Sequence, residues 1–276
     1  MIELKNFSFS YGLAPVFENI DLQFKEGNIY GLLGENGVGK TTMLKIISGL
    51  LRPKSGSCTV DGNVCFDRKP EFLENIFFLP DDVPLPDNST PFGFFRDLAG
   101  FYAGSNEEEM QRLAKEFNID PSRRFKEMSF GQQKKSLIVC ALALNTRYLL
   151  LDEPTNGLDI PSKADFRRIL SERVGGGQTI IISTHQVKDV ENLIDPIIII
   201  SNSSVLLNAS VERITEKLYF EYGGQQRPDA LYSEMMPGGY LNVLPNNGMG
   251  ESQINIEALF NAVLRNREAI NNNFNF

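Results

Sequence analysis

The sequence predicts an α/β fold with an antiparallel β subdomain, a helical subdomain and a small C-terminal α+β extension. Continuous apolar runs at 148–151 and 179–182 are typical of strands buried on both faces of a parallel sheet. Alternating apolar and polar residues at 2–9 and 20–24 instead predict half-buried antiparallel strands. A glycine-rich loop at 34–41 adds a strand-loop-helix unit.

This loop, Gly34-Glu35-Asn36-Gly37-Val38-Gly39-Lys40-Thr41, follows the apolar run 29–33 and precedes a helical segment at 42–47. Glycines let backbone amides converge on phosphate oxygens, and the helix offers its positive N-terminus. Lys40 would reach the β and γ phosphates, and the Thr41 hydroxyl would bind Mg²⁺. A plain glycine-rich turn is the alternative. We expect ATP-type nucleotide binding by Asn36, Gly37, Val38, Gly39, Lys40, Thr41 and Thr42.

A hairpin is predicted next, because Asp61-Gly62-Asn63 separates the short apolar segments 58–60 and 64–66 and favours positive φ. From about residue 84 to 145 the character is polar and helical, which predicts an inserted helical subdomain. Within it, Ser105 and Glu108 have capping-box spacing at the start of one helix.

The chain of 276 residues is long enough for about two domains. Its 35 acidic and 27 basic residues give a net charge of -8, which argues against nucleic acid as a partner. We expect no signal peptide and no membrane-spanning segment, and hence a cytoplasmic protein whose membrane role, if any, comes through a partner.

An acidic pair, Asp152-Glu153, ends the apolar run 148–151. An aspartate at this place can hold Mg²⁺ through its water shell, and the adjacent glutamate can act as general base toward water. The alternative is an acidic pair that simply ends a strand. The following Pro154-Thr155-Asn156-Gly157-Leu158-Asp159 favours the catalytic interpretation.

About twenty residues before the acidic strand lies Met128-Ser129-Phe130-Gly131-Gln132-Gln133-Lys134-Lys135. Ser129 and Gly131 present a hydroxyl and an amide at a helix start, which suits a γ-phosphate, although an ordinary serine N-cap gives the same pattern. Together, over about residues 1 to 210, the ordered motifs resemble the nucleotide-binding subunit of an ABC transporter, with its P-loop NTPase ABC-ATPase fold and a type-2 exporter-like character.

The resemblance assigns further roles. It implies that Ser129, Gly131 and Gln132 bind nucleotide as the signature motif, and that adenine stacks on Tyr11. It makes His185, after the strand 179–182, the switch histidine that contacts the γ-phosphate and orients the water beside the base Glu153. The Gly157-Leu158-Asp159 segment resembles the loop that crosses the dimer interface.

Two positions depart from the family pattern. Asp81 stands where a glutamine is usual, so it could reach Mg²⁺ only through water or affect coupling more than hydrolysis, and an exposed loop acid is the alternative. Phe130 stands where a glycine is usual, and it could pack against a partner while Ser129 and Gly131 still face phosphate. The predicted metal ligands are therefore Thr41, Asp152 and Asp81.

The resemblance further implies a homodimer or heterodimer of ATPase subunits that closes on ATP and Mg²⁺, hydrolyses ATP and powers export through an integral membrane permease. The chain would then lie in the cytoplasm, on the inner face of the membrane. A soluble ABC ATPase acting on a ribosome, or a regulatory nucleotide-binding module, are the alternatives. We predict an ABC ATPase domain at 1–210, with the helical subdomain inserted at about 84–145, and an extension at 211–276 with an asparagine-rich, frayed end at 271–276.

Overall fold

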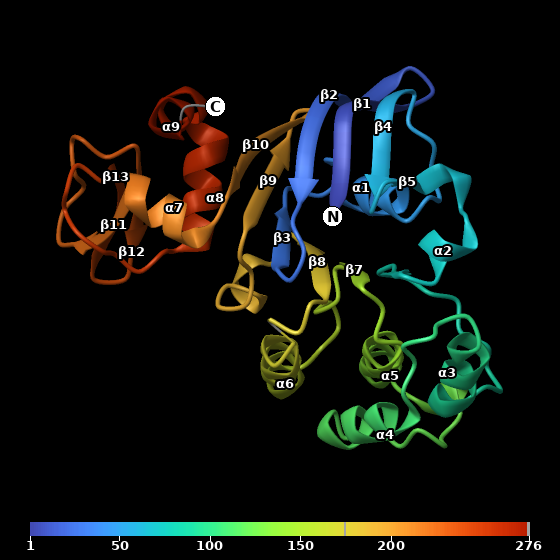
Figure 1. The fold of residues 1–276 in the computed structure, drawn as a ribbon. Helices are drawn as coiled ribbons and strands as arrows, with labels where there is room; N and C mark the ends of the chain where they lie inside the picture. Colours follow the sequence, from blue (N-terminus) through green and yellow to red (C-terminus); the bar gives the residue numbers. More distant parts are fainter. Residues whose placement is uncertain (174, 275–276) are drawn as a thin grey trace.

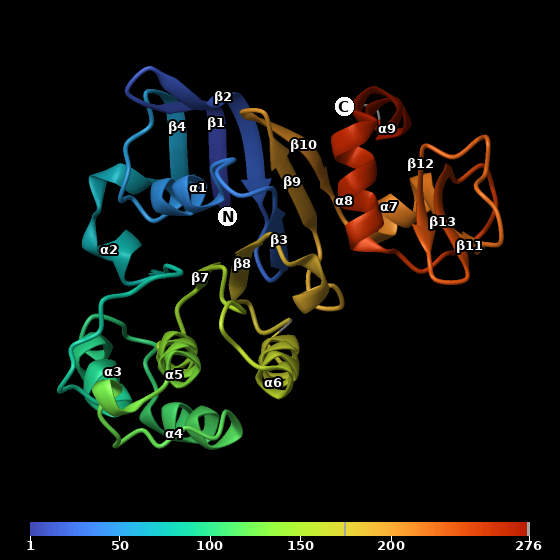
Figure 2. The same ribbon diagram turned by 180° about the vertical axis from the view of Figure 1, so that it is seen from behind.

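The computed structural model of the protein describes residues 1–173 and 175–274, and it contains three sheets. An antiparallel sheet and helix α1 (Lys40–Ile47) lie over one side of a six-stranded sheet. Helices α3 (Pro91–Ala99), α4 (Glu107–Glu116) and α5 (Phe130–Ala143) gather at another side of the molecule (Figure 1). A further lobe runs from β11 (Leu218–Gly223) to α9 (Arg267–Phe274), and its helix α8 (Ile256–Arg265) lies beside strands β9 (Ile197–Ser201) and β10 (Ser204–Ala209), as the view from behind also shows (Figure 2). Within the described ranges no helix is long and apolar enough to cross a bilayer.

The antiparallel sheet has the order β2-β1-β4-β5, formed by β1 (Ile2–Tyr11), β2 (Ala14–Phe24), β4 (Ser55–Val60) and β5 (Asn63–Val64). The hairpin turn between β4 and β5 is formed by Asp61 and Gly62, both with positive φ, 49° and 79°. The hairpin prediction is confirmed, but its second strand is shorter than expected. Cys65–Asp67 forms a 3₁₀ turn (η1) instead.

The six-stranded sheet has the order β10-β9-β3-β8-β7-β6, in which only the edge strand β10 pairs antiparallel. Its strands are β3 (Ile29–Leu33), β6 (Ile76–Leu79), β7 (Tyr148–Asp152), β8 (Thr179–Thr184), β9 (Ile197–Ser201) and β10 (Ser204–Ala209). Every residue of β3, β7, β8 and β9 is buried, as the apolar runs predict.

Successive residues of these strands belong to two different hydrophobic clusters, one on each face of the sheet. Tyr148 and Leu150 pack with helix α1 (Lys40–Ile47) and the antiparallel sheet, whereas Leu149 and Leu151 pack with the helical region. Side chains in a strand alternate between faces, so a sheet covered on both sides needs an unbroken apolar sequence. This sheet therefore holds the carboxyl ends of β3, β7 and β8 in fixed positions.

We expect Leu150→Ala to lower the free energy of unfolding by about 2 to 5 kcal/mol, because it leaves a cavity between β7 and the antiparallel layer. Leu150 has 0% of its surface exposed. Urea denaturation followed by circular dichroism would measure the change. Met235→Ala, at an exposed strand position, is the matched control, and an equal loss in both variants would contradict this account of the core.

Between β6 and β7 the chain forms helices α3 (Pro91–Ala99), α4 (Glu107–Glu116) and α5 (Phe130–Ala143), with a 3₁₀ turn η2 at Phe125–Glu127. Helix α4 begins where predicted, but its N-cap is Asn106, which accepts a hydrogen bond from Glu109 N. The Ser105 prediction is wrong, since its hydroxyl donates to Ala99 O. Asparagine is as good an N-cap as serine, so spacing alone could not separate the two.

The remaining elements of the first 210 residues are α2 (Pro70–Leu73), α6 (Ile160–Ser171) and η3 (Val187–Asp189). The C-terminal lobe contains α7 (Val211–Lys217), strands β11 (Leu218–Gly223), β12 (Tyr232–Met236) and β13 (Gly239–Pro245), then α8 (Ile256–Arg265) and α9 (Arg267–Phe274).

Helix α8 connects this lobe to the rest of the chain, because it contacts β9, β10 and η3 as well as its own strands. Ile256 and Leu259 of α8 are fully buried and belong to the same cluster as the parallel sheet. The expectation of a frayed end from 271 is wrong as far as residue 274, because α9 continues and buries Phe274. Residues 275 and 276 lie outside the described part.

Candidate functional site

The glycine-rich loop runs from the end of β3 to the start of α1, as the sequence predicts. Gly37 and Gly39 have φ of 85° and 111°, a region that other residues rarely adopt. A Cβ on Gly39 would lie 2.6 Å from Val16 and 2.8 Å from the ring of Phe17. Helix α1 has no side-chain cap, so its first amides stay available to an anion.

Lys40 lies under this loop with only 6% of its surface exposed. Its Nζ donates to Gly34 O at 2.7 Å and to Glu35 O at 3.2 Å, and it lies 3.5 Å from Glu153 Oε1. Burial lowers the pKa of the Lys40 ammonium, and the nearby carboxylate of Glu153 partly opposes this shift. An anionic ligand beside this buried ammonium would stabilise its charged form, and this attraction would favour binding of the ligand.

Asp152 ends β7 and is held by two hydroxyl groups. Thr41 Oγ1 donates to its Oδ2 at 2.7 Å, and Ser183 Oγ on β8 donates to its Oδ1. A buried carboxylate beside a threonine hydroxyl offers hard oxygen ligands, which Mg²⁺ prefers, together with phosphate oxygens. The residues at this point therefore fit Mg²⁺.

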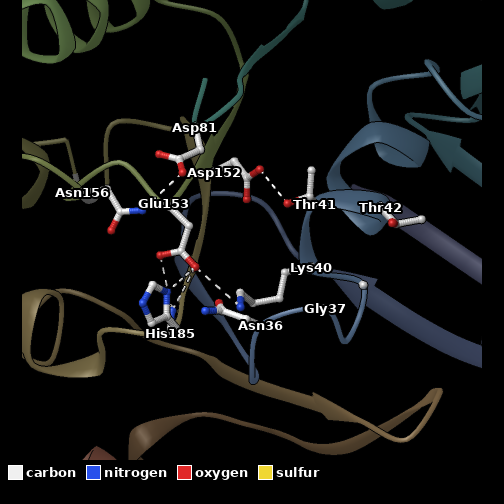
Figure 3. A pocket seen from close by; sticks show the side chains of 11 residues that line it. Asn36, Gly37, Lys40, Thr41, Thr42, Asp81, Asp152, Glu153, Asn156 and His185 are labelled. Carbon is white, nitrogen blue, oxygen red and sulfur yellow. Dashed lines mark hydrogen bonds and ion pairs between the residues drawn. The ribbon is translucent and has the colours of Figure 1, made fainter. Parts of the chain in front are cut away.

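Glu153 follows Asp152 in a left-handed conformation, with φ of 45°, and its side chain lies between Lys40 and His185 (Figure 3). Its Oε1 accepts a hydrogen bond from His185 N at 3.1 Å and lies 2.8 Å from His185 Nδ1. The ring nitrogen Nδ1 and the backbone amide of His185 therefore both lie against the Glu153 carboxylate.

A cavity of about 340 Å³ joins these groups. Most of the predicted nucleotide, metal and catalytic residues line it: Asn36, Gly37, Gly39, Lys40, Thr41, Thr42, Asp81, Asp152, Glu153 and His185. Val38 does not line it and packs partly buried against the hydrophobic cluster. Tyr11 also lies outside its walls, half exposed, with its hydroxyl 3.3 Å from Thr42 Oγ1.

Asp81 enters the cavity from the segment after β6, and both of its carboxylate oxygens have partners. Lys134 Nζ donates to Oδ1 at 3.0 Å, and Asn156 Nδ2 donates to Oδ2 at 3.3 Å. Asn156 itself lines the cavity, although we did not predict it as a site residue. The sequence signal that could have identified Asn156 is its position, three residues after Glu153 in the segment that follows the acidic strand.

The signature residues lie elsewhere. Ser129, Gly131 and Gln132 line a second cavity of about 340 Å³ together with Lys135, Gly157, Leu158, Asp159 and Ser162. Ser129 and Gln132 form a reciprocal capping box, in which Ser129 Oγ accepts from Gln132 N and Gln132 Oε1 accepts from Ser129 N. The N-cap alternative therefore describes Ser129 in the isolated chain.

Phe130 is 62% exposed, and its ring lies against Gly157. A Cβ on Gly157, which has a φ of 77°, would come within 2.5 Å of the Phe130 ring. The aromatic residue at the usual glycine position therefore packs on the backbone of the loop after β7. Gly131 remains in the second cavity beside it.

A buried lysine beneath a glycine loop, facing an acidic pair at the end of a neighbouring strand, suits the cleavage of a phosphoanhydride, since cations, amides and a general base converge on one cavity. The fold and the site define a P-loop nucleoside triphosphatase.

Comparison with known proteins narrows this class. Residues 17–156 match the family model for ABC transporters. The lantibiotic transport ATP-binding protein SrtF of Streptococcus pyogenes is 30% identical over 86% of this chain and 97% of its own. A solved ATP-binding subunit of an ABC transporter matches with a TM-score of 0.72 and 27% identity over 78% of this chain and 91% of that one.

The dimeric ATP-binding cassette MJ0796, solved in a post-hydrolysis state with ADP and Pi, matches with a TM-score of 0.66 and 25% identity over 76% of this chain and 99% of that one. The chain belongs to the ABC transporter family. It is an ATP-binding ABC ATPase, and the predicted fold class is confirmed.

Proposed function

We propose that this chain powers export through a separate integral membrane permease, by closing and opening as a dimer of ATPase subunits. In this proposal each ATP lies between the phosphate loop of one subunit and Ser129, Gly131 and Gln132 of the other. The permease would hold the chain on the cytoplasmic face of the membrane. The name of the relative SrtF, a transport ATP-binding protein, supports a transport role.

One observation supports the dimer most directly. The phosphate-loop cavity and the signature cavity share no lining residue, so the two sets of phosphate-binding groups do not form one site within the chain. A second subunit in head-to-tail orientation would place one set opposite the other. The dimeric form of the cassette MJ0796 is consistent with this arrangement.

The site residues would share the work of hydrolysis. Lys40 and the loop amides would bind the β and γ phosphates, and Tyr11 would stack on adenine. Glu153 would take a proton from water while His185 orients it near the γ-phosphate. When bound, Mg²⁺ would neutralise phosphate charge, held by Thr41 and Asp152, with Asp81 reaching it through water.

The domain division is part of the same proposal. Residues 1–210 would form the ATPase domain, with the helical subdomain at about 84–145 as the permease-facing part, and 211–276 would form the extension. The helical subdomain would then contain helices α3 to α5, and the extension would contain the elements from α7 to α9.

Co-purification tests the transporter role. The chain, tagged and expressed in its own cells, should recover an integral membrane protein from detergent-solubilised membranes. We expect this recovery to survive Lys40→Ala, since docking to a permease does not need bound ATP. Recovery with ribosomes alone would contradict the proposal.

A further inference from the structure

An ion pair between a buried lysine and a partly exposed aspartate links the helix that begins at the signature segment to the nucleotide cavity of the same chain. Lys134 lies one turn inside α5, and its side chain is 2% exposed. Its Nζ donates to Asp81 Oδ1 at 3.0 Å and to Asp81 O at 2.8 Å. The lysine therefore fixes both the carboxylate and the backbone of Asp81.

The other oxygen of Asp81 continues this connection. Asn156 Nδ2 donates to Oδ2 at 3.3 Å, and Gln186 Nε2 donates to Asn156 Oδ1 at 3.1 Å. Asn156 lies three residues after Glu153 in the segment that follows β7. Gln186 directly follows His185 in the segment after β8. A continuous set of hydrogen bonds thus runs from α5 through Asp81 to the loops that carry the base and the histidine, and Figure 3 shows its central contact.

Charge makes the two ends of the pair unequal. A buried ammonium without a counter-charge is costly, whereas the Asp81 side chain is 43% exposed and can be hydrated. A neutral glutamine at position 81 would leave the charge of Lys134 unbalanced. The buried charge of Lys134 therefore depends on an aspartate at position 81.

From these contacts we infer that Lys134 is a positioning residue for ATP hydrolysis. Lys134 holds Asp81 at the cavity wall and balances the charge of the Asp81 carboxylate beside the triphosphate. The same contact connects helix α5 to the loops that carry Glu153 and His185 in the same subunit. This inference rests on the proposed function. Without Lys134 the carboxylate keeps its negative charge next to the phosphates but loses its fixed position.

Thermal unfolding of the nucleotide-free and Mg²⁺-free protein tests the pair itself. We expect Asp81→Ala to lower Tm by several degrees and more than Lys134→Met does, because only the first leaves a buried charge unpaired. Adding Lys134→Met to Asp81→Ala should raise Tm again. Additive losses in the double variant would overturn the pairing.

Steady-state ATPase measurements test the positioning role. Lys134→Met should lower kcat roughly tenfold, as the loss of a residue that orients a ligand group commonly does, with a smaller change in KM for ATP. Lys115→Met, at an exposed lysine of α4 in the same helical region, is the matched control. A normal kcat in Lys134→Met would overturn this inference alone, whereas no ATP turnover by the unmodified protein would contradict the proposed function.

Discussion

Glu153→Gln should abolish most ATP turnover while ATP binding and ATP-dependent dimers are retained. A positioned general base contributes about 10²- to 10⁴-fold to a rate, so we expect kcat to fall within that range. The amide has the same size as the carboxylate, and its oxygen can still accept the hydrogen bond from His185 N that the structure shows at 3.1 Å. Phosphate release measures the rate, and size-exclusion chromatography with and without ATP measures the dimer.

Glu108→Gln is the control for this change, since Glu108 is exposed in the first turn of α4 and the substitution is identical. It should leave turnover at the level of the unmodified protein. Phosphate release at a normal rate from Glu153→Gln would remove Glu153 from its assigned role. A variant that neither turns over nor forms dimers would show that the glutamate is needed for closure instead.

The sequence predicted those parts of the site that depend on local pattern. The phosphate loop needs glycine at positions with positive φ, directly between a buried strand and a helix, and all of these signals lie within residues 29–47. Asp152 and Glu153 were also predictable, because the acidic pair directly follows an apolar strand and precedes the segment 154–159, which together favour the catalytic interpretation.

The remaining features depend on contacts between distant segments. Lys134 and Asp81 are 53 positions apart, and no periodicity relates a residue of α5 to the loop after β6. The left-handed φ of 45° at Glu153 was likewise hidden, since glutamate has no preference for that conformation. Such strained positions occur at functional sites where the surrounding strands hold them, and here β8 holds Glu153, whose backbone N donates to Ser183 O at 2.9 Å.

Two errors in the predicted boundaries of secondary-structure elements also have a physical origin. Cys65 and Phe66 have strand-like side chains, yet the backbone forms η1, which packs closely against the end of α1: a Cβ on Gly49 would lie only 2.2 Å from Cys65 O. The asparagine-rich end has weak helix propensity, but the buried Phe274 attaches α9 to the core. Tertiary packing decided both cases.

Lys40→Ala should weaken ATP binding by about 10- to 150-fold, because a hydrogen bond to a charged group contributes about 1.5 to 3 kcal/mol. Lys40 is almost fully buried at the floor of the loop, and Gly34 O and Glu35 O hold its ammonium in place. No other lysine or arginine lines this cavity among the described residues, so the charge is not replaced. Titration calorimetry with ATP would measure the affinity.

Lys45→Ala, in the last turn of the same helix, is the control, and it should bind ATP normally.

The two variants should also differ in their response to pH. Because burial lowers the pKa of Lys40, the unmodified protein and Lys45→Ala should lose ATP affinity as the pH rises through that lowered pKa, below the usual 10.5 of a lysine. Lys40→Ala cannot lose a proton at this position, so its weaker affinity should not show that decline. Normal ATP affinity in Lys40→Ala would mean that the phosphates bind elsewhere in the chain.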